Sequence, residues 1–334
     1  MHFWTDYGLF LAKIITAIIA IFILTSGIIA ITRKGKAASK DKLSIKKLNA
    51  KYEELAETLN AEILDKKARK ELARQQKVEK KASTKIVDKK VAKKCIFVVQ
   101  FNGDIKASAV NSLREEITAI LTVATPKDEV VVRLESGGGM IAPYGLAASQ
   151  LERLKKKSIP LTVTVDKIAA SGGYMMACVA DRILAAPFAI IGSIGVVAQI
   201  PNFHRLLKKN DIDFEMLTAG EYKRTLTMFG ENTEKGKLKF QEDLEEIHHL
   251  FKDFIRHNRP IVDIQQVATG EHWLAKRAQQ LNLVDDLITS DDYLLSASSQ
   301  ADIYEVKYAA RKSLAEKLTA AVYMAYDWFN VRGI

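Results

Sequence analysis

The chain has 334 residues, of which 48% are hydrophobic and 27% are charged, and this composition excludes a protein that is disordered throughout. Its formal net charge of +10 would usually point to nucleic acid. However, residues 33–94 hold 21 Lys and Arg against 9 Asp and Glu, whereas the rest of the chain holds 29 against 31. The basic charge belongs to one segment, so we expect no nucleic-acid partner.

An apolar segment near the start predicts a transmembrane anchor. Residues 9–31 carry one charge, Lys13, and a helix of that length spans roughly 34 Å, enough for a hydrocarbon core of about 30 Å. In the short flank of residues 1–8, Trp4 and Tyr7 suit the membrane interface. A cleaved signal peptide is the alternative, but its apolar region would be shorter and preceded by basic residues.

A basic segment, residues 32–94, follows the anchor and is interpreted as a stalk or linker. Within it, residues 41–74 predict a helix, because apolar side chains recur at spacings of three and four. These side chains are Leu48, Tyr52, Leu55, Leu59 and Ile63. A helical stalk and a solvated, partly ordered linker explain this pattern equally well. The lysine-rich end of the segment could contact anionic lipid headgroups.

The folded body, residues 95–290, alternates short apolar strands with helices and therefore predicts an α/β fold with a largely parallel sheet. The expected strands are 95–101, 129–134, 161–165 and 182–186, and the expected helices are 110–121, 144–154, 234–258, 262–267 and 274–281. Residues 186–200 are apolar but too short for a second span, so we expect a buried turn and strand there. Residues 291–334 form a C-terminal extension, in which 313–329 is amphipathic and could pack within the chain or against another subunit.

Two glycine-rich turns follow predicted strands and are the first candidates for chemistry. Residues 135–139 read ESGGG and residues 170–174 read ASGGY, which places Ser171 before two glycines. Neither turn matches a nucleotide-binding motif. An oxyanion hole beside a serine nucleophile explains them better, because backbone N–H groups can approach a ligand closely where no Cβ intervenes. A helix after Ser171 would add its positive end to the site.

A nucleophilic serine needs a base, and the histidines stand at no diagnostic spacing. The paired His248 and His249 fall on a charged helix, where we expect a solvated face. A lysine can serve as base when burial disfavours its charge. Lys223 lies in a largely uncharged stretch and is one candidate among the lysines. The two cysteines, Cys95 and Cys178, lie in apolar runs without metal or disulfide spacing, and we expect two buried free thiols.

Three motifs in this order resemble the signal peptide peptidase A family of serine proteases. They are ASGGYMMA at 170–177, IGSIGVV at 191–197 and AGEYKRTLTMF at 219–229, and the likeness extends over about 95–287. The anchor and basic stalk are similar to those of SohB-type members. The resemblance implies a ClpP/crotonase-like fold of repeated ββα units, with no metal and no cofactor.

The resemblance also implies the roles of five residues in a Ser-Lys dyad. Ser171 would be the nucleophile and Lys223 the general base. Ser193 would orient the lysine, while the N–H groups of Gly138 and Gly172 would form the oxyanion hole. The family pattern Ser-Pro-Gly-Gly stands here as Ser-Gly-Gly-Gly at 136–139, so the proline is replaced.

The activity implied by this resemblance is that of a membrane-anchored serine endopeptidase. Its substrates would be signal peptides or misfolded membrane-associated polypeptides, and its partners would be lipid and further copies in a homo-oligomer. The expected location is the bacterial inner membrane, where family analogy favours a periplasmic body and the basic flank favours a cytoplasmic one. The alternatives are a catalytically inactive membrane scaffold and an acyl-CoA enzyme of the same fold.

Overall fold

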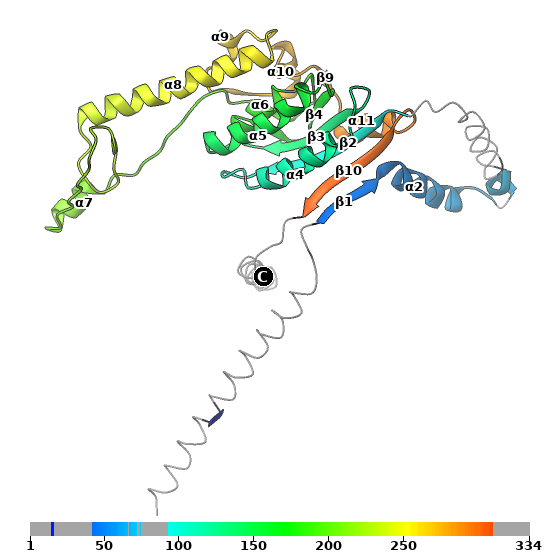
Figure 1. Cartoon of the computed structure of the whole chain (residues 1–334), viewed down its shortest axis with the longest axis horizontal. Helices are drawn as coiled ribbons and strands as arrows, with labels where there is room; N and C mark the ends of the chain where they lie inside the picture. The colour runs from blue at the N-terminus through cyan, green and yellow to red at the C-terminus, as the bar shows by residue number, and fades with distance from the viewer. Residues whose placement is uncertain (1–14, 17–41, 66, 72–73, 75–92, 310–334) are drawn as a thin grey trace, which may run out of the picture. The chain divides into compact units, whose positions relative to one another are not determined.

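The computed structural model describes residues 15–16, 42–65, 67–71, 74 and 93–309 (Figure 1). The chain divides into two compact units, of which Ser44–Lys307 contains nearly all described residues and carries the site. The predicted anchor, apart from residues 15–16, and the amphipathic segment 313–329 lie outside the described residues. No helix within the described ranges is both long and apolar enough to cross a bilayer.

A mainly parallel sheet forms the centre of the larger unit, and it confirms the four strands expected from the sequence. They are β2 (Cys95–Gly103), β3 (Glu129–Ser136), β4 (Leu161–Val165) and β6 (Arg182–Ala185). Each pairs in parallel with the next, from β2 through β3 and β4 to β6. β9 (Asp286–Leu287) extends the sheet beside β6, and β10 (Asp302–Ala309) extends it beside β2.

The sheet branches at the carboxyl end of β3. There Ser136 pairs with Ala169 of the short strand β5 (Ile168–Ala170). β5 pairs in parallel with β7 (Ile190–Gly192), and β7 pairs antiparallel with β8 (His272–Leu274). Because β3, β5 and β7 run parallel, their carboxyl ends lie at one edge, and the residues that follow them meet there.

Helices cover one face of the sheet in chain order. α4 (Val110–Leu121) contacts α5 (Ile141–Lys155), which contacts α6 (Gly172–Ala177). The side chains that α4 and α5 direct inward are fully buried, and they include Ile117, Tyr144, Leu151 and Leu154. This arrangement confirms the helices expected at 110–121 and 144–154, and it holds α6 against the end of β3.

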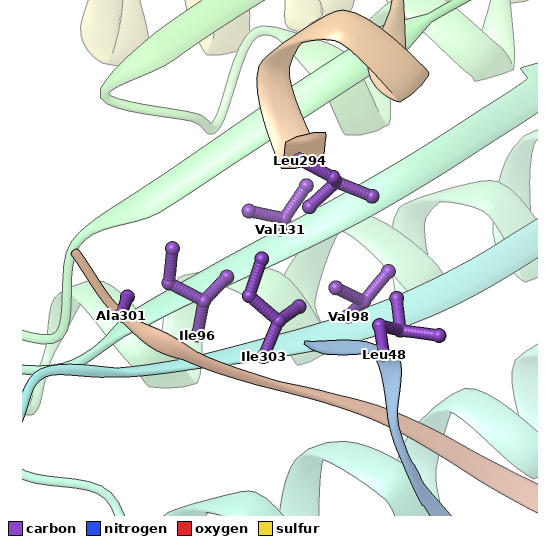
Figure 2. Close-up of a cluster of buried hydrophobic side chains, with 7 residues drawn as sticks. All are labelled: Leu48, Ile96, Val98, Val131, Leu294, Ala301 and Ile303. Carbon is purple, nitrogen blue, oxygen red and sulfur yellow. The ribbon is translucent and has the colours of Figure 1, made fainter. Parts of the chain in front are cut away.

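The opposite face carries a second apolar cluster, shown in Figure 2. Its members come from the start of α2 (Leu48–Ile63), from β2, β3 and β10, and from α11 (Ser290–Ala297) and the turn after it. They are Leu48, Ile96, Val98, Val131, Leu294, Ala301 and Ile303. Residues from before 95 and after 290 therefore pack on the same sheet as the body predicted from the sequence.

The start of the basic segment differs from its prediction. Residues 42–47, expected to be helical, form strand β1 (Lys42–Lys47), which lies beside β10 in the sheet. The helix begins only at Leu48. The reason is pairing with a distant part of the chain, β10, and side-chain bonds at Asn49 hold this end of the segment there. The Asn49 amide donates to Ser298 O and Ala301 O, both at 2.9 Å, and its Oδ1 accepts from Ile303 N at 2.7 Å.

The remaining helices follow β7 in the chain. α8 (Glu234–Asn258), α9 (Ile264–Val267) and α10 (Ala275–Gln280) confirm the expected helices at 234–258, 262–267 and 274–281 to within a few residues. In the stretch 186–200, Ala189, Ile191 and Ile194 are buried as expected. Residues 187–188 and 197–200 are exposed, with Phe188 at 82% and Val197 at 79%, so the prediction of a buried turn is wrong at both ends of the stretch.

Residues 198–233, called the arm below, connect β7 to α8. The arm contains one short helix, α7 (His204–Lys209), and three aromatic rings that contact one another. The ring centroid of Phe229 lies 6.1 Å from that of Phe203 and 5.9 Å from that of Phe214. Figure 1 shows α7 below the N-terminal end of α8 and away from the sheet. These three side chains are between 40% and 43% exposed, so they form a small apolar cluster on the surface of the arm and not a buried core.

Candidate active site

Ser171 occupies a strained turn between β5 and α6. Its φ is 52° and its ψ is −119°, a combination that residues with a Cβ rarely adopt. Two hydrogen bonds hold the turn: Ser171 N donates to Gly192 O at 2.8 Å, and Met175 N donates to Ser171 O at 2.9 Å. A serine on a sharp strand-to-helix turn presents its hydroxyl clear of the backbone, as a nucleophile requires.

Ser193 directly follows β7, the strand that pairs with β5, and so lies beside Ser171. Ala170 pairs with Gly192 across β5 and β7, so the two serines follow at matching positions. Ser193 also has a φ of 52°, and its N–H donates to Glu271 O at 2.6 Å. Gly192 must be glycine, because it has a φ of 108° and an added Cβ would lie 2.9 Å from the Trp273 ring.

The glycine turn after β3 lies directly against the nucleophile. Gly138 has a φ of 88°, and a Cβ there would lie 2.7 Å from Ser171 Cβ and 2.8 Å from Gly172 N. The Gly138 N–H donates to Ser136 Oγ at 3.1 Å. α6 begins at Gly172, so the Gly172 N–H has no acceptor within its own helix. Two expected amide donors therefore lie beside Ser171.

These four residues line one cavity of about 910 Å³. They are Ser171, Ser193, Gly138 and Gly172. The rest of the wall is mainly apolar and includes Ile105, Met140, Val196, Leu244, Ile247 and Phe251. Such a cavity suits an extended apolar chain whose carbonyl carbon reaches the serine.

Lys223, the predicted base, is not in the wall of this cavity. It lies in an irregular part of the arm, where its side chain is exposed and its N–H donates to Gly220 O at 3.2 Å. Within the described chain, the structure brings four of the five predicted site residues together and leaves Lys223 apart from them. The roles of all five residues stay predictions.

Sequence reasoning missed a buried chain of hydroxyl groups under the glycine turn. Ser136 Oγ lies 2.5 Å from the Tyr144 hydroxyl, which donates to Asp104 O at 2.8 Å. Both side chains are at most 1% exposed. Burial raises the pKa of Tyr144, so its hydroxyl stays protonated at neutral pH. No sequence signal marks this pair except that Ser136 directly precedes the glycines of the ESGGG turn.

Sequence reasoning also assigned His248 to a solvated helix face, and this prediction is wrong. His248 lines the cavity, and its Nε2 is buried without a hydrogen-bond partner. Its neighbour His249 is exposed as expected, 3.7 Å from Asp253 Oδ2. The signal was available, because Leu244, His248, Phe251 and Ile255 recur at the spacing of one helix face.

The structure gives no sign of a metal site among the described residues, where no three His, Cys, Asp or Glu side chains gather. Cys178 is fully buried, and burial raises its pKa, so it stays a thiol. Cys95 is only partly buried, contrary to the expectation of two buried thiols.

Comparison with known proteins places the chain among peptidases, with family matches over most of its length. Residues 2–151 match the family model Peptidase family S49 N-terminal, and residues 153–304 match Peptidase family S49. A Haemophilus influenzae protein named "Probable protease SohB" is 51% identical over 325 residues, covering 94% of this chain and 91% of that protein. A Buchnera aphidicola protein of the same name is 51% identical over 323 residues, covering 96% of this chain and 95% of its own length.

Among solved structures, a 1510-N membrane-bound stomatin-specific protease variant in complex with a substrate peptide aligns with a TM-score of 0.42 and 14% identity. The alignment covers 70% of this chain and 99% of that one.

Proposed function

The chain belongs to peptidase family S49, and on that premise we propose that it cleaves peptide bonds with Ser171 as nucleophile and Lys223 as general base. The observation that carries the proposal is the strained turn at Ser171. It presents the hydroxyl to a cavity, next to two amide donors and a second serine. This is the arrangement that acyl transfer needs.

The reaction proceeds in two acyl-transfer steps. The neutral Lys223 amine takes the Ser171 proton as Oγ attacks the substrate carbonyl carbon. The Gly138 and Gly172 N–H groups then stabilise the oxyanion, each contributing about 3–4 kcal/mol by analogy with measured oxyanion-hole donors. Lys223 returns the proton to the departing amine, and the acyl-enzyme remains. Water, deprotonated by the same lysine, attacks the ester carbonyl carbon. The lysine then gives this proton to Ser171 Oγ as the bond to the acyl group breaks and the acid is released.

Two proposed hydrogen-bonding arrangements fit the observed geometry to this mechanism. The Gly138 N–H already donates to Ser136 Oγ, so we propose that it shares its proton between Ser136 and the oxyanion in a three-centre hydrogen bond. Ser193 lies beside Ser171, where its hydroxyl can accept a hydrogen bond from the lysine amine and aim the nitrogen at Ser171.

Lys223 must reach the cavity, and we propose that assembly of a homo-oligomer brings it there. The arm exposes large apolar side chains that a monomer would leave in water, including Leu206, Ile212, Phe214 and Leu217, the last of these 96% exposed. Exposed apolar patches of this kind mark interaction sites. When the arm packs on a second copy, Lys223 of one copy completes the cavity of its neighbour.

The substrate class follows from the cavity wall. Six of its named side chains are apolar, so we propose extended apolar peptides, such as released signal peptides or misfolded membrane-associated segments. The sequence-predicted anchor would hold the enzyme in the bacterial inner membrane beside such substrates, with its basic segment near anionic lipid. A catalytically inactive scaffold is the alternative.

Covalent labelling of the full-length protein in detergent separates these alternatives. We expect a fluorophosphonate probe to modify Ser171, as read by mass spectrometry of the digested protein. An apolar peptide added in excess should slow the labelling. An unmodified Ser171 under conditions that label a reference serine protease would exclude the proposed nucleophile and favour the scaffold.

A further inference from the structure

We propose that Ser136 and Tyr144 are positioning residues that fix both amide donors of the oxyanion hole. This inference rests on the proposed function and deepens it. Neither side chain lines the cavity, so each would act through the glycines rather than on the substrate.

The hydrogen bonds that link the Ser136 and Tyr144 hydroxyl groups can be donated in only one direction. Tyr144 uses its single proton to donate to the Asp104 carbonyl oxygen, which can only accept. Ser136 must therefore donate its own proton to the Tyr144 oxygen across 2.5 Å. With that proton committed, Ser136 Oγ offers only lone pairs to the Gly138 N–H at 3.1 Å. Each bond orients the next, so the plane of the Gly138 amide is set by the Tyr144 hydroxyl.

The Tyr144 ring reaches the other donor. A Cβ added at Gly172 would lie 2.4 Å from Tyr144 Cγ, so the ring lies directly against the Gly172 backbone. A Cβ at Gly103 would lie 2.4 Å from both the Ser136 and Tyr144 oxygens, and glycine there leaves room for the pair. One fully buried side chain thus contacts the glycine of one donor and, through Ser136, binds the other.

This arrangement predicts that substitution of Ser136 or Tyr144 lowers the rate of the reaction and not the affinity for the substrate. Tyr144 projects from α5 and Ser136 ends β3, so both are held by regular structure instead of by the loop they orient. The oxyanion exists only in the transition state and the tetrahedral intermediate. Misplaced donors therefore lower kcat and leave KM nearly unchanged.

The test compares Tyr144→Phe and Ser136→Ala with a matched control, Tyr174→Phe. Tyr174 is equally buried, and its hydroxyl donates to Leu283 O at 3.1 Å. We expect both test variants to lower kcat about 10- to 100-fold on an apolar fluorogenic peptide, with KM changed less than about threefold. The double variant should be no worse than the poorer single variant. Tyr174→Phe should lose thermal stability and keep its kcat.

Three outcomes would overturn the inference. They are an unchanged kcat in Tyr144→Phe, an equal loss of kcat in Tyr174→Phe, and a raised kcat in Ser136→Ala. The last would mean that Ser136 competes with the oxyanion for the Gly138 N–H. Full activity in Ser171→Ala would instead refute the proposed function, so the two failures are distinguishable.

A second observation concerns His248. Its Nε2 is the one buried side-chain nitrogen or oxygen, among the described residues, that has no hydrogen-bond partner. Leaving such an atom unpaired costs about 1–3 kcal/mol. His248 is one of the residues that line the cavity that holds Ser171. The structure assigns His248 to substrate binding. Because the proposed substrate has apolar side chains, the partner for Nε2 is a main-chain amide group of the peptide.

Substitution and peptide chemistry together test this assignment, with His249→Leu as the control on the same helix. We expect His248→Leu to lower kcat/KM about 3- to 10-fold and to raise thermal stability, because an apolar side chain replaces an unpaired polar one. His249→Leu should change neither property. A purely structural histidine would not lower activity while raising stability.

Peptides in which single amides are replaced by esters then locate the partner. At one position the ester should weaken cleavage by the unsubstituted protein and have no effect on His248→Leu. If every ester peptide affected the two proteins equally, or if His248→Leu kept its full kcat/KM, the assignment would be wrong. Loss of all cleavage by Ser171→Ala, measured alongside, keeps this result separate from the proposed function.

Discussion

Ser171 and Ser193 leave neighbouring parallel strands at the same register position, and both adopt a φ of 52°. The N–H groups of the two turns donate to carbonyl oxygens in different parts of the chain. Ser171 N donates to Gly192 O, and Ser193 N donates to Glu271 O. Backbone strain of this kind costs about 1–3 kcal/mol at each residue and persists only where the surrounding structure enforces it. The fold thus holds two serines at neighbouring positions in the wall of the cavity.

If the Ser193 hydroxyl orients Lys223, its removal should slow the reaction whichever residue replaces it. We expect Ser193→Ala and Ser193→Gly to lower kcat by a similar factor, about 10- to 100-fold, because a misaimed base loses that much. The two variants separate the hydroxyl from the backbone, since glycine relieves the positive φ and alanine does not. A normal kcat in Ser193→Gly with a loss in Ser193→Ala would assign the effect to strain instead.

The proposed dyad predicts that Ser171→Ala and Lys223→Ala each lower kcat by at least about 1,000-fold, since each removes an essential part of proton transfer or attack. The control is Lys209→Ala, which removes an exposed lysine from α7 of the same arm and should keep full activity. Circular dichroism spectra and thermal unfolding would show that all three variants fold. Peptidase activity in either dyad variant comparable to that of Lys209→Ala would refute the assignment.

The proposal that Lys223 of one copy completes the cavity of a second copy can be tested by mixing inactive variants. Lys223 does not line the cavity of its own chain, so we expect mixed assemblies of Ser171→Ala and Lys223→Ala to recover part of the activity. Some cavities would then combine an intact serine with an intact lysine from the neighbour. The measurement is peptide cleavage after the two variants are dissociated and reassembled together. No recovery in assemblies shown to be mixed would place both residues of the dyad in one chain.

Substitution by alanine should have opposite effects at two glycines near the site. At Gly138 the φ of 88° and the 2.7 Å approach to Ser171 Cβ leave no room for a side chain, so Gly138→Ala should abolish activity. Gly145 lies within α5, and a Cβ there would meet nothing within 4 Å. Gly145→Ala should keep full activity and stabilise the protein by about 0.5–1 kcal/mol, as measured by denaturant unfolding. Equal behaviour of the two variants would contradict the packing described here.

The sequence predicted the parts of the fold that depend on local pattern. The strands β2, β3, β4 and β6 and the long helices have periodic apolar residues, and the structure confirms them. β1 was mistaken for helix, because its conformation depends on β10, more than 250 residues away in the chain. The local sequence pattern cannot predict a strand that forms only because it pairs with a strand so far away in the chain.

The residues of the candidate site divide in the same way into those that the sequence predicts and those that it does not. Ser171, Ser193, Gly138 and Gly172 each follow a strand or open a helix, and parallel pairing brings them together. The Tyr144 hydroxyl and His248 Nε2 could not be assigned from the sequence, because their significance lies in three-dimensional partners: one is bonded to Ser136, and the other has no partner. Lys223 was one candidate base because its stretch is largely uncharged, and the family resemblance selected it. Its exposure in the described chain could not be predicted from its local sequence.

A buried carboxylate far from the site predicts how stability depends on pH. Burial alone would raise the pKa of Glu129, but hydrogen bonds from Lys94, Tyr293 and Thr162 lower it overall, below the ordinary value of 4.5. These bonds measure 2.6, 2.6 and 2.7 Å. Since the folded-state pKa is depressed, the stabilisation is fully present above about pH 4.5 and is lost as the pH falls through the folded value.

Glu129→Gln removes this titration. We expect the variant to be less stable than the unsubstituted protein at pH 7, because an amide cannot accept all three bonds as a carboxylate does. We also expect the difference to shrink between about pH 4.5 and pH 3, as measured by urea unfolding at each pH. Glu129 begins β3, at the end of the strand opposite Ser136, so kcat at pH 7 and 25 °C should be unchanged. A stability difference that stayed constant down to pH 3 would show that Glu129 does not titrate as described.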